Sequence, residues 1–413
     1  MVSACGSKKD DSGKAGGDGD EAAKRAEADK RAVAPLAERL AAESPPSLER
    51  APIAPPNAEL AADAEGYVKA ARVSLGPLAA GVDPDIVFAA SERWLAAPEE
   101  VRKLGKDARS GEVAGLIAAG AMAPEPSTAG EPSAWKGATG VAIAWAQETA
   151  AGGKRADASW KLLAAIQLGY DLARGKRFAD AEGGLAIARD AARALRHVIA
   201  NSDKKSLPND ALAGVLAGCL AVLPNRVSTP DMLMAGARWD DQVVAAAFGG
   251  GEPPAGATEA DLDSARANAA KLGGAAALVA KRDGVREAID SIRSDDLHGG
   301  ARQAQIAEAR AQHWGKGAAG VAADDVGRLE LANAEMTGTC LVIALELDRR
   351  KRNKLAKDLA ALTPKPLAEP LLDPIRNQPW ELVDDGLGGR VLRSGSVQHG
   401  GKTARVEISI SAR

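Results

Sequence analysis

The chain has 413 residues, of which 46% are hydrophobic and 26% charged, values typical of a globular protein with a sizeable core. Its formal net charge of -3 offers no basic surface for phosphate contacts, so we expect no nucleic-acid partner. Aromatic residues make up only 3%, and apolar runs are short of the about 20 residues that a bilayer requires. We therefore expect a core of small side chains and no membrane-spanning helix.

The first residues carry a pattern typical of a bacterial lipobox. Val2-Ser3-Ala4 places a branched aliphatic and two small residues before Cys5, which would accept the lipid. A Gly-, Ser-, Lys- and Asp-rich stretch follows, and we predict a disordered tether over residues 1–35. The alternative is a chance tetrapeptide in a disordered cytosolic tail. Because no charged and apolar leader precedes the box, we expect the natural precursor to begin upstream of Met1.

Residues 36–125 are predicted to form a small helical segment. Helical periodicity over 21–43 is interrupted by Pro35, and a Pro-rich joint follows. Asp83 can cap a helix that has Pro84 at its first position. A second joint precedes residue 134.

Residues 134–362 are predicted to form a larger helical body. Leu212, Val215, Cys219 and Leu223 follow helical spacing, and Thr258 with Asp261 resembles a capping box for a later helix. The segment around Met336 to Leu347 is apolar on most sides, which predicts a central helix.

Residues 363–413 change character, and we predict a C-terminal β-hairpin cap. The Pro-punctuated link at its start cannot stay helical. Strands are expected at 380–383, at 390–394 and through Val406, Ile408 and Ile410, which alternate with polar residues. The predicted fold class is therefore mainly α, with a multi-helix body and a small antiparallel sheet.

The C-terminal segment also resembles a group of uncharacterised bacterial envelope lipoproteins, and its Asp-Pro hairpin resembles the end of major pseudopilins. The residues that carry the resemblance are Asp373, Pro374, Asn377, Pro379, Gly386, Ser394 and Gly395. The helix pair spanning 162–198 is similar to the helical body of that envelope group. The resemblance implies a fold and a compartment but no reaction. The calcium loop of pseudopilins is not expected, because "SVQHGGKTA" has no carboxylate.

Two further cysteines lie on apolar helix faces. Cys219 and Cys340 are expected to be buried, and a disulfide between them is one of two readings, the other being free core thiols.

Candidate catalytic or metal-binding groups are few, and we predict neither a metal site nor a cofactor. His197 is interpreted as a solvated cation near a helix end, and His298, His313 and His399 lack ligand spacing. Ser202 and Lys205 imitate the serine–lysine pair of penicillin-recognising enzymes, with Ser294-Asp295 and Lys402-Thr403 in the same order. The scattered tryptophans are expected to fill the core, with a binding groove as the alternative; they are Trp94, Trp135, Trp145, Trp160, Trp239, Trp314 and Trp380.

From these patterns we predict a non-enzymatic envelope lipoprotein that acts as an interaction or assembly module. Its partners would be a membrane, through the lipid on Cys5, and another protein. Gly6 after the cysteine favours the outer membrane facing the periplasm. The alternatives are a ligand-binding envelope protein with a groove in the helical body, and a serine-type envelope hydrolase that uses Ser202.

Overall fold

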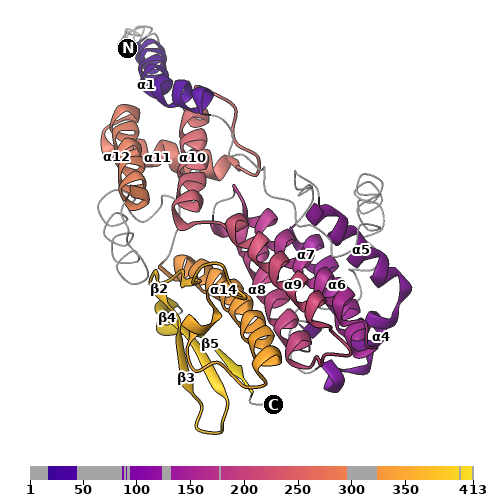
Figure 1. Ribbon diagram of the computed structural model, residues 1–413. Coiled ribbons are helices and arrows are strands. Elements are labelled where there is room, and N and C mark those ends of the chain that lie inside the picture. Colours follow the sequence, from indigo (N-terminus) through magenta and orange to yellow (C-terminus); the bar gives the residue numbers. More distant parts are fainter. Residues whose placement is uncertain are drawn as a thin grey trace, which may run out of the picture. The chain divides into compact units, whose positions relative to one another are not determined.

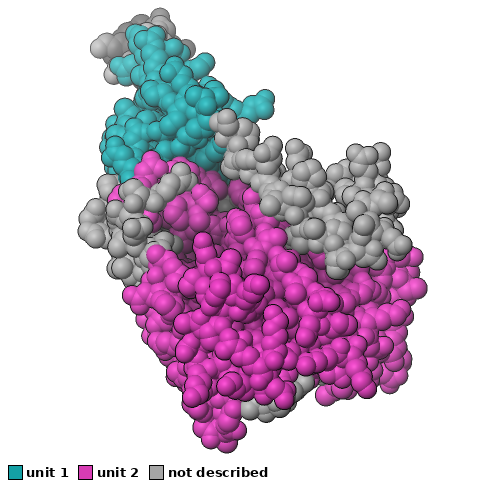
Figure 2. Space-filling model, in the orientation of Figure 1, with its two compact units in different colours: residues 1–45, 237–288, 313–319 teal, residues 46–236, 289–312, 320–413 magenta. Residues whose placement is uncertain are grey.

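The computed structural model describes residues 17–43, 86–87, 90, 94–122, 132–175, 178–294, 323–399 and 401–411 (Figure 1). Over these ranges the chain is mainly α-helical and ends in a small antiparallel sheet, which confirms the predicted fold class. It divides into two compact units, coloured separately in Figure 2. Unit 1 comprises residues 1–45, 237–288 and 313–319, and unit 2 comprises residues 46–236, 289–312 and 320–413.

Unit 1 joins the N-terminal helix to a segment from the middle of the chain. Its helices are α1 (Gly17–Ala42), the second half of α10 (Thr229–Ala247), α11 (Glu259–Leu272) and most of α12 (Ala275–Ser294). Val33 and Leu36 of α1 are buried against the apolar faces of these helices, among Val243, Val244, Ala265, Ala269, Leu278 and Val279.

The tether predicted for residues 1–35 is therefore wrong for residues 17–35. Pro35 lies inside α1 and is exposed, so the helix continues through it while its neighbours Val33 and Leu36 are fully buried. The predicted helical body also needs correction, because residues 237–288 belong to unit 1. Most of the predicted segment before residue 94, including Asp83 and Pro84, lies outside the described residues.

The start of α11 has the predicted capping box. The Asp261 carboxylate accepts a 2.8 Å hydrogen bond from the backbone N–H of Thr258, and the Thr258 side chain accepts one from the backbone N–H of Asp261. These bonds satisfy N–H groups that have no partner within the helix.

Unit 2 contains the helical body and the sheet. Its helices include α4 (Glu99–Lys106), α5 (Ala108–Met122), α6 (Pro132–Ala151), α7 (Arg155–Ala173), α8 (Phe178–Ala200) and α9 (Asn209–Val222), with short turns η2 (Trp94–Ala96) and η3 (Leu223–Asn225). Every residue of α7 from Ala158 to Ala173 is buried. This helix therefore forms the centre of the bundle.

Helices α7 and α8 approach each other through glycines. A Cβ added at Gly169 would lie 2.5 Å from the backbone nitrogen of Ala188, and one added at Gly184 would lie 2.5 Å from the carbonyl oxygen of Gly169. Only glycine allows the two backbones to come this close. The expected small-residue core is thus present at this interface.

Helix α14 (Ala323–Arg352) lies between the helices and the sheet (Figure 1). It contacts α8 and α9 as well as β4 (Arg390–His399) and β5 (Lys402–Ile410). Gly338 makes room on its sheet side, because a Cβ there would lie 2.7 Å from Ile408 and 3.1 Å from Trp380. The prediction of a central helix around Met336 to Leu347 is confirmed by the burial of these residues.

The C-terminal strands form the predicted cap. β3 (Glu381–Asp384), β4 and β5 pair antiparallel in that order, with Leu382 opposite Leu392 and Leu392 opposite Ile408. A separate two-residue pair, β1 (Leu372–Asp373) and β2 (Gln378–Pro379), precedes them. The expected alternation holds in β5, where Val406 and Ile408 are buried.

Candidate functional site

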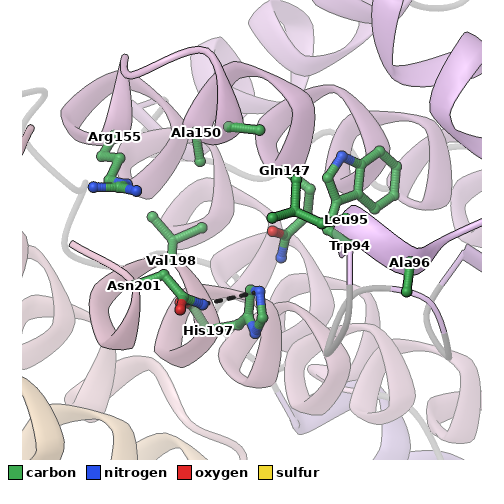
Figure 3. A pocket seen from close by; sticks show the side chains of 10 residues that line it. Trp94, Leu95, Ala96, Gln147, Ala150, Arg155, His197, Val198 and Asn201 are labelled. Atoms are coloured by element: carbon green, nitrogen blue, oxygen red, sulfur yellow. Dashed lines mark hydrogen bonds between the residues drawn. The ribbon is translucent and has the colours of Figure 1, made fainter.

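An open pocket of about 420 Å³ lies in the helical body of unit 2 (Figure 3). Its walls come from four elements: η2, the end of α6, the start of α7 and the end of α8. The lining residues are Trp94, Leu95, Ala96, Gln147, Ala150, Ala151, Arg155, His197, Val198 and Asn201. The short turn between α6 and α7 and the antiparallel course of α8 bring these helix ends together.

Trp94 and Leu95 form an apolar side of the pocket. Trp94 is only 2% exposed, and its indole N–H donates a 2.8 Å hydrogen bond to Glu148. Burial tends to raise the pKa of Glu148, but hydrogen bonds from Trp94 and Arg102 outweigh it, and the pKa lies below its ordinary value. The carboxylate therefore stays charged and holds the indole in place. Leu95, next in sequence, is 77% exposed at the pocket mouth.

Polar side chains of Gln147, Arg155, His197 and Asn201 also line the pocket. Asn201 donates through Nδ2 to the carbonyl oxygen of His197 at 2.9 Å and lies 3.1 Å from Nε2 of the same residue. Gln147 donates to the carbonyl oxygen of Ala194. Arg155 donates to the hydroxyl of Ser206. In Figure 3, Arg155 lies on one side of the pocket and Trp94 on the other, with Val198 and Ala150 between them.

The pocket is suited to non-covalent binding. Apolar side chains with a few placed polar groups are the usual lining of a small-molecule site. Within the described ranges, no group of three or more His, Cys, Asp or Glu residues could hold a metal ion. His197 lies in the last turn of α8, as predicted, and it is half-buried where it lines the pocket.

Sequence reasoning did not identify the pocket residues Leu95, Gln147, Arg155 and Asn201. Each belongs to a different element or to a different helix end, so no local motif connects them. The only available signal was the short "GGK" turn between two predicted helices, which implies that the helix ends beside it are neighbours.

The serine–lysine constellation receives no support from Ser202. Its hydroxyl donates a 2.7 Å hydrogen bond to the carbonyl oxygen of Ile199 and accepts one from Arg350, also at 2.7 Å. The first bond closes the turn at the end of α8, and the second holds that turn against α14. Lys205 is exposed. Asp295, His298, His313 and Trp314 lie outside the described residues.

Cys219 on α9 and Cys340 on α14 are both buried with 0% exposure, as predicted. Burial raises the pKa of the Cys219 thiol well above its ordinary value, and hydrogen-bonding contact with the Cys340 thiol raises it further. The structure thus brings the two predicted residues together, as free thiols rather than a disulfide.

The C-terminal motif residues form a structural corner. The Asp373 carboxylate is fully buried and accepts hydrogen bonds from the backbone N–H groups of Ile375 and Gly395 and from the Arg376 guanidinium. Ser394 accepts a 2.8 Å bond from the backbone N–H of Val406. Asn377 and Gly386 adopt positive φ angles of 54° and 74° in the two turns. These contacts fix the link to the sheet, and Pro374 and Pro379 lie within the same corner.

Buried tryptophans elsewhere act as core residues, as expected. Trp160 and Trp380 are 2% and 4% exposed. Cys5 lies outside the described residues.

In the part of the chain that the structure describes, no single helix is long and apolar enough to cross a membrane. One bent pair, Asn209–Asn225 with Thr229–Ala247, passes that test by length and composition only. Comparison of the chain with family models, curated proteins and solved structures finds no match.

Proposed function

We propose that this protein binds a small, largely apolar ligand in the pocket of its helical body, and that a lipid on Cys5 holds it at a membrane of the cell envelope. The pocket is the observation that supports binding. Its volume of about 420 Å³ lies within the usual range for ligand sites, and its walls are fixed by the buried Trp94 and by three helix ends. Among the roles predicted from the sequence, the pocket favours ligand binding over a pure assembly module.

Leu95 adds a specific argument for an apolar ligand. A leucine that is 77% exposed gains little from its own fold, but it would gain from contact with an apolar molecule beside Trp94. Single exposed leucines are common on protein surfaces, so the exposure of Leu95 supports ligand binding only because this residue also lines the pocket.

Ligand binding can be tested with N-phenyl-1-naphthylamine, a neutral probe whose fluorescence rises in an apolar environment. We expect saturable binding to the wild-type protein. Leu95→Asp should weaken it by about tenfold, because it removes apolar contact and places a charge beside the ligand. Leu387→Asp is the matched control, since Leu387 is 91% exposed in the hairpin turn and does not line the pocket. Equal binding by the two variants would contradict the proposal.

The anchor rests on the lipobox pattern at Val2 to Cys5, and it is tested separately. Metabolic labelling of the natural precursor with a palmitate analogue should mark the wild type and a Cys219→Ala control, but not Cys5→Ser. The control shows that removal of a different cysteine does not abolish labelling. Labelling of Cys5→Ser to the wild-type level would rule the anchor out.

A further inference from the structure

One side of the pocket is cationic, because Arg155 lines it and forms no ion pair with the described residues. Among the residues that the structure describes, Arg155 has a single hydrogen-bond acceptor, the Ser206 hydroxyl, and no carboxylate within ion-pair distance. The guanidinium has several further N–H donors in a planar fork. Two other arginines of unit 2 differ in this respect, since Arg102 pairs with Glu148 and Arg196 with Glu335.

Arg155 is also held in position. The Ser206 hydroxyl that accepts its hydrogen bond donates in turn to the Asp203 carboxylate at 2.6 Å. Hydrogen bonds from the side chain and backbone of Ser206, together with the charge of Arg155, lower the pKa of Asp203 to about 2. The guanidinium is thus oriented through a hydroxyl and not neutralised by direct ion pairing.

The sequence around this wall carries an excess of positive charge. Lys154 precedes Arg155, and Lys204 and Lys205 lie in the turn that contains Ser206. Against these four cations stand two nearby carboxylates, on Asp157 and Asp203. The net positive charge favours an anionic ligand group, and the one guanidinium in the pocket lining is matched by a single carboxylate.

The opposite side of the pocket has a different character. Trp94 and Leu95 lie across the pocket from Arg155, with Val198 and Ala150 between them (Figure 3). A ligand that filled this space would meet a cationic donor at one end and apolar side chains along the rest of its length.

We infer that the ligand is an amphiphilic monoanion, with a carboxylate bound by Arg155 and an apolar chain that reaches Trp94 and Leu95. A planar guanidinium fork matches the two oxygens of a carboxylate. This inference rests on the proposed ligand-binding function and specifies its substrate class.

The experiment compares decanoate with decan-1-ol, which has the same chain but no charge, by isothermal titration calorimetry near neutral pH. We expect the wild type to bind decanoate at least about tenfold more tightly, the size expected for hydrogen bonds to a charged group. Arg155→Gln should remove this preference by weakening decanoate binding far more than decan-1-ol binding, and Arg155→Lys should retain part of it. Arg109→Gln is the control, because Arg109 is exposed, pairs with Asp107 and does not line the pocket.

The outcomes separate the two proposals. If the wild type binds both ligands equally, or if Arg155→Gln keeps the preference, the ligand class is wrong while binding of the neutral naphthylamine probe still supports the pocket. If neither ligand nor the naphthylamine binds, the proposed function itself fails. Naphthylamine binding to Arg155→Gln shows that this variant is folded.

Discussion

Gly169→Ala is expected to lower the free energy of unfolding of unit 2 by about 3 kcal/mol, although it adds a single methyl group. The new Cβ would lie 2.5 Å from the backbone nitrogen of Ala188, 2.6 Å from the carbonyl oxygen of Gly184 and 2.8 Å from the Ala188 Cβ. Two of these atoms belong to the backbone, so no side-chain rotation relieves the overlap. Helices α7 and α8 would have to separate, which reduces packing along their whole length.

Gly214→Ala in α9 is the matched control. It makes the same chemical change inside a helix of the same unit, but no atom lies within 4 Å of the added Cβ. Its stability should rise by about 0.5–1 kcal/mol, because alanine favours the helix over glycine. Urea unfolding followed by circular dichroism, with hydrogen exchange of α7 peptides, measures both variants. Equal stability of the two variants would show that helices α7 and α8 have room for a methyl group at Gly169.

The contrast between these glycines shows what the sequence could predict. Helical spacing placed Leu212, Val215 and Cys219 on one buried face, because a single helix carries its own period of apolar residues. The close approach of Gly169 to Gly184 depends on the register between two helices, which no local pattern records. For the same reason the burial of Cys219 and Cys340 was predictable, but their contact was not.

The candidate site was less accessible to sequence reasoning than the fold. The sequence places His197 near the end of a helix. No residue close to it in the sequence indicates that η2 and the end of α6 complete a pocket around it. The error at the N-terminus has a different origin. Charge and glycine before residue 21 suggested disorder as far as residue 35, while the pair Val33 and Leu36, three residues apart, already indicated a buried helix face.

What holds that N-terminal helix is a buried ionic network in unit 1. Asp241 on α10 is 0% exposed, and its carboxylate accepts 2.7 Å hydrogen bonds from Arg282 and Arg286 of α12. Arg39 of α1 adds a third bond at 3.2 Å. Farther from Asp241, Glu43 pairs with Arg286 and Asp283 pairs with Arg39. One carboxylate thus links three helices that lie far apart in the sequence.

Asp241→Asn should therefore destabilise unit 1 by about 3–5 kcal/mol, the usual cost of breaking a buried ion pair from one side. The amide has nearly the same shape as the carboxylate, but it leaves Arg282 and Arg286 without their central counter-charge and presents N–H donors to N–H donors. Because Arg39 also loses its bond to Asp241, hydrogen exchange should rise in residues 17–43 as well as in 237–288. Exchange measured by mass spectrometry reports both segments at once.

Asp263→Asn is the control for this change, since it makes the same substitution in the same unit. Asp263 pairs with Arg266 on the surface of α11, where the two side chains are 66% and 43% exposed. Exposed pairs contribute about 0–1 kcal/mol, so exchange should stay close to that of the wild type. If Asp241→Asn behaved like this control, the network would not be what attaches α1. If it loosened 237–288 but left 17–43 protected, the burial of Val33 and Leu36 alone would suffice to hold the helix, and the role assigned to Arg39 would be wrong.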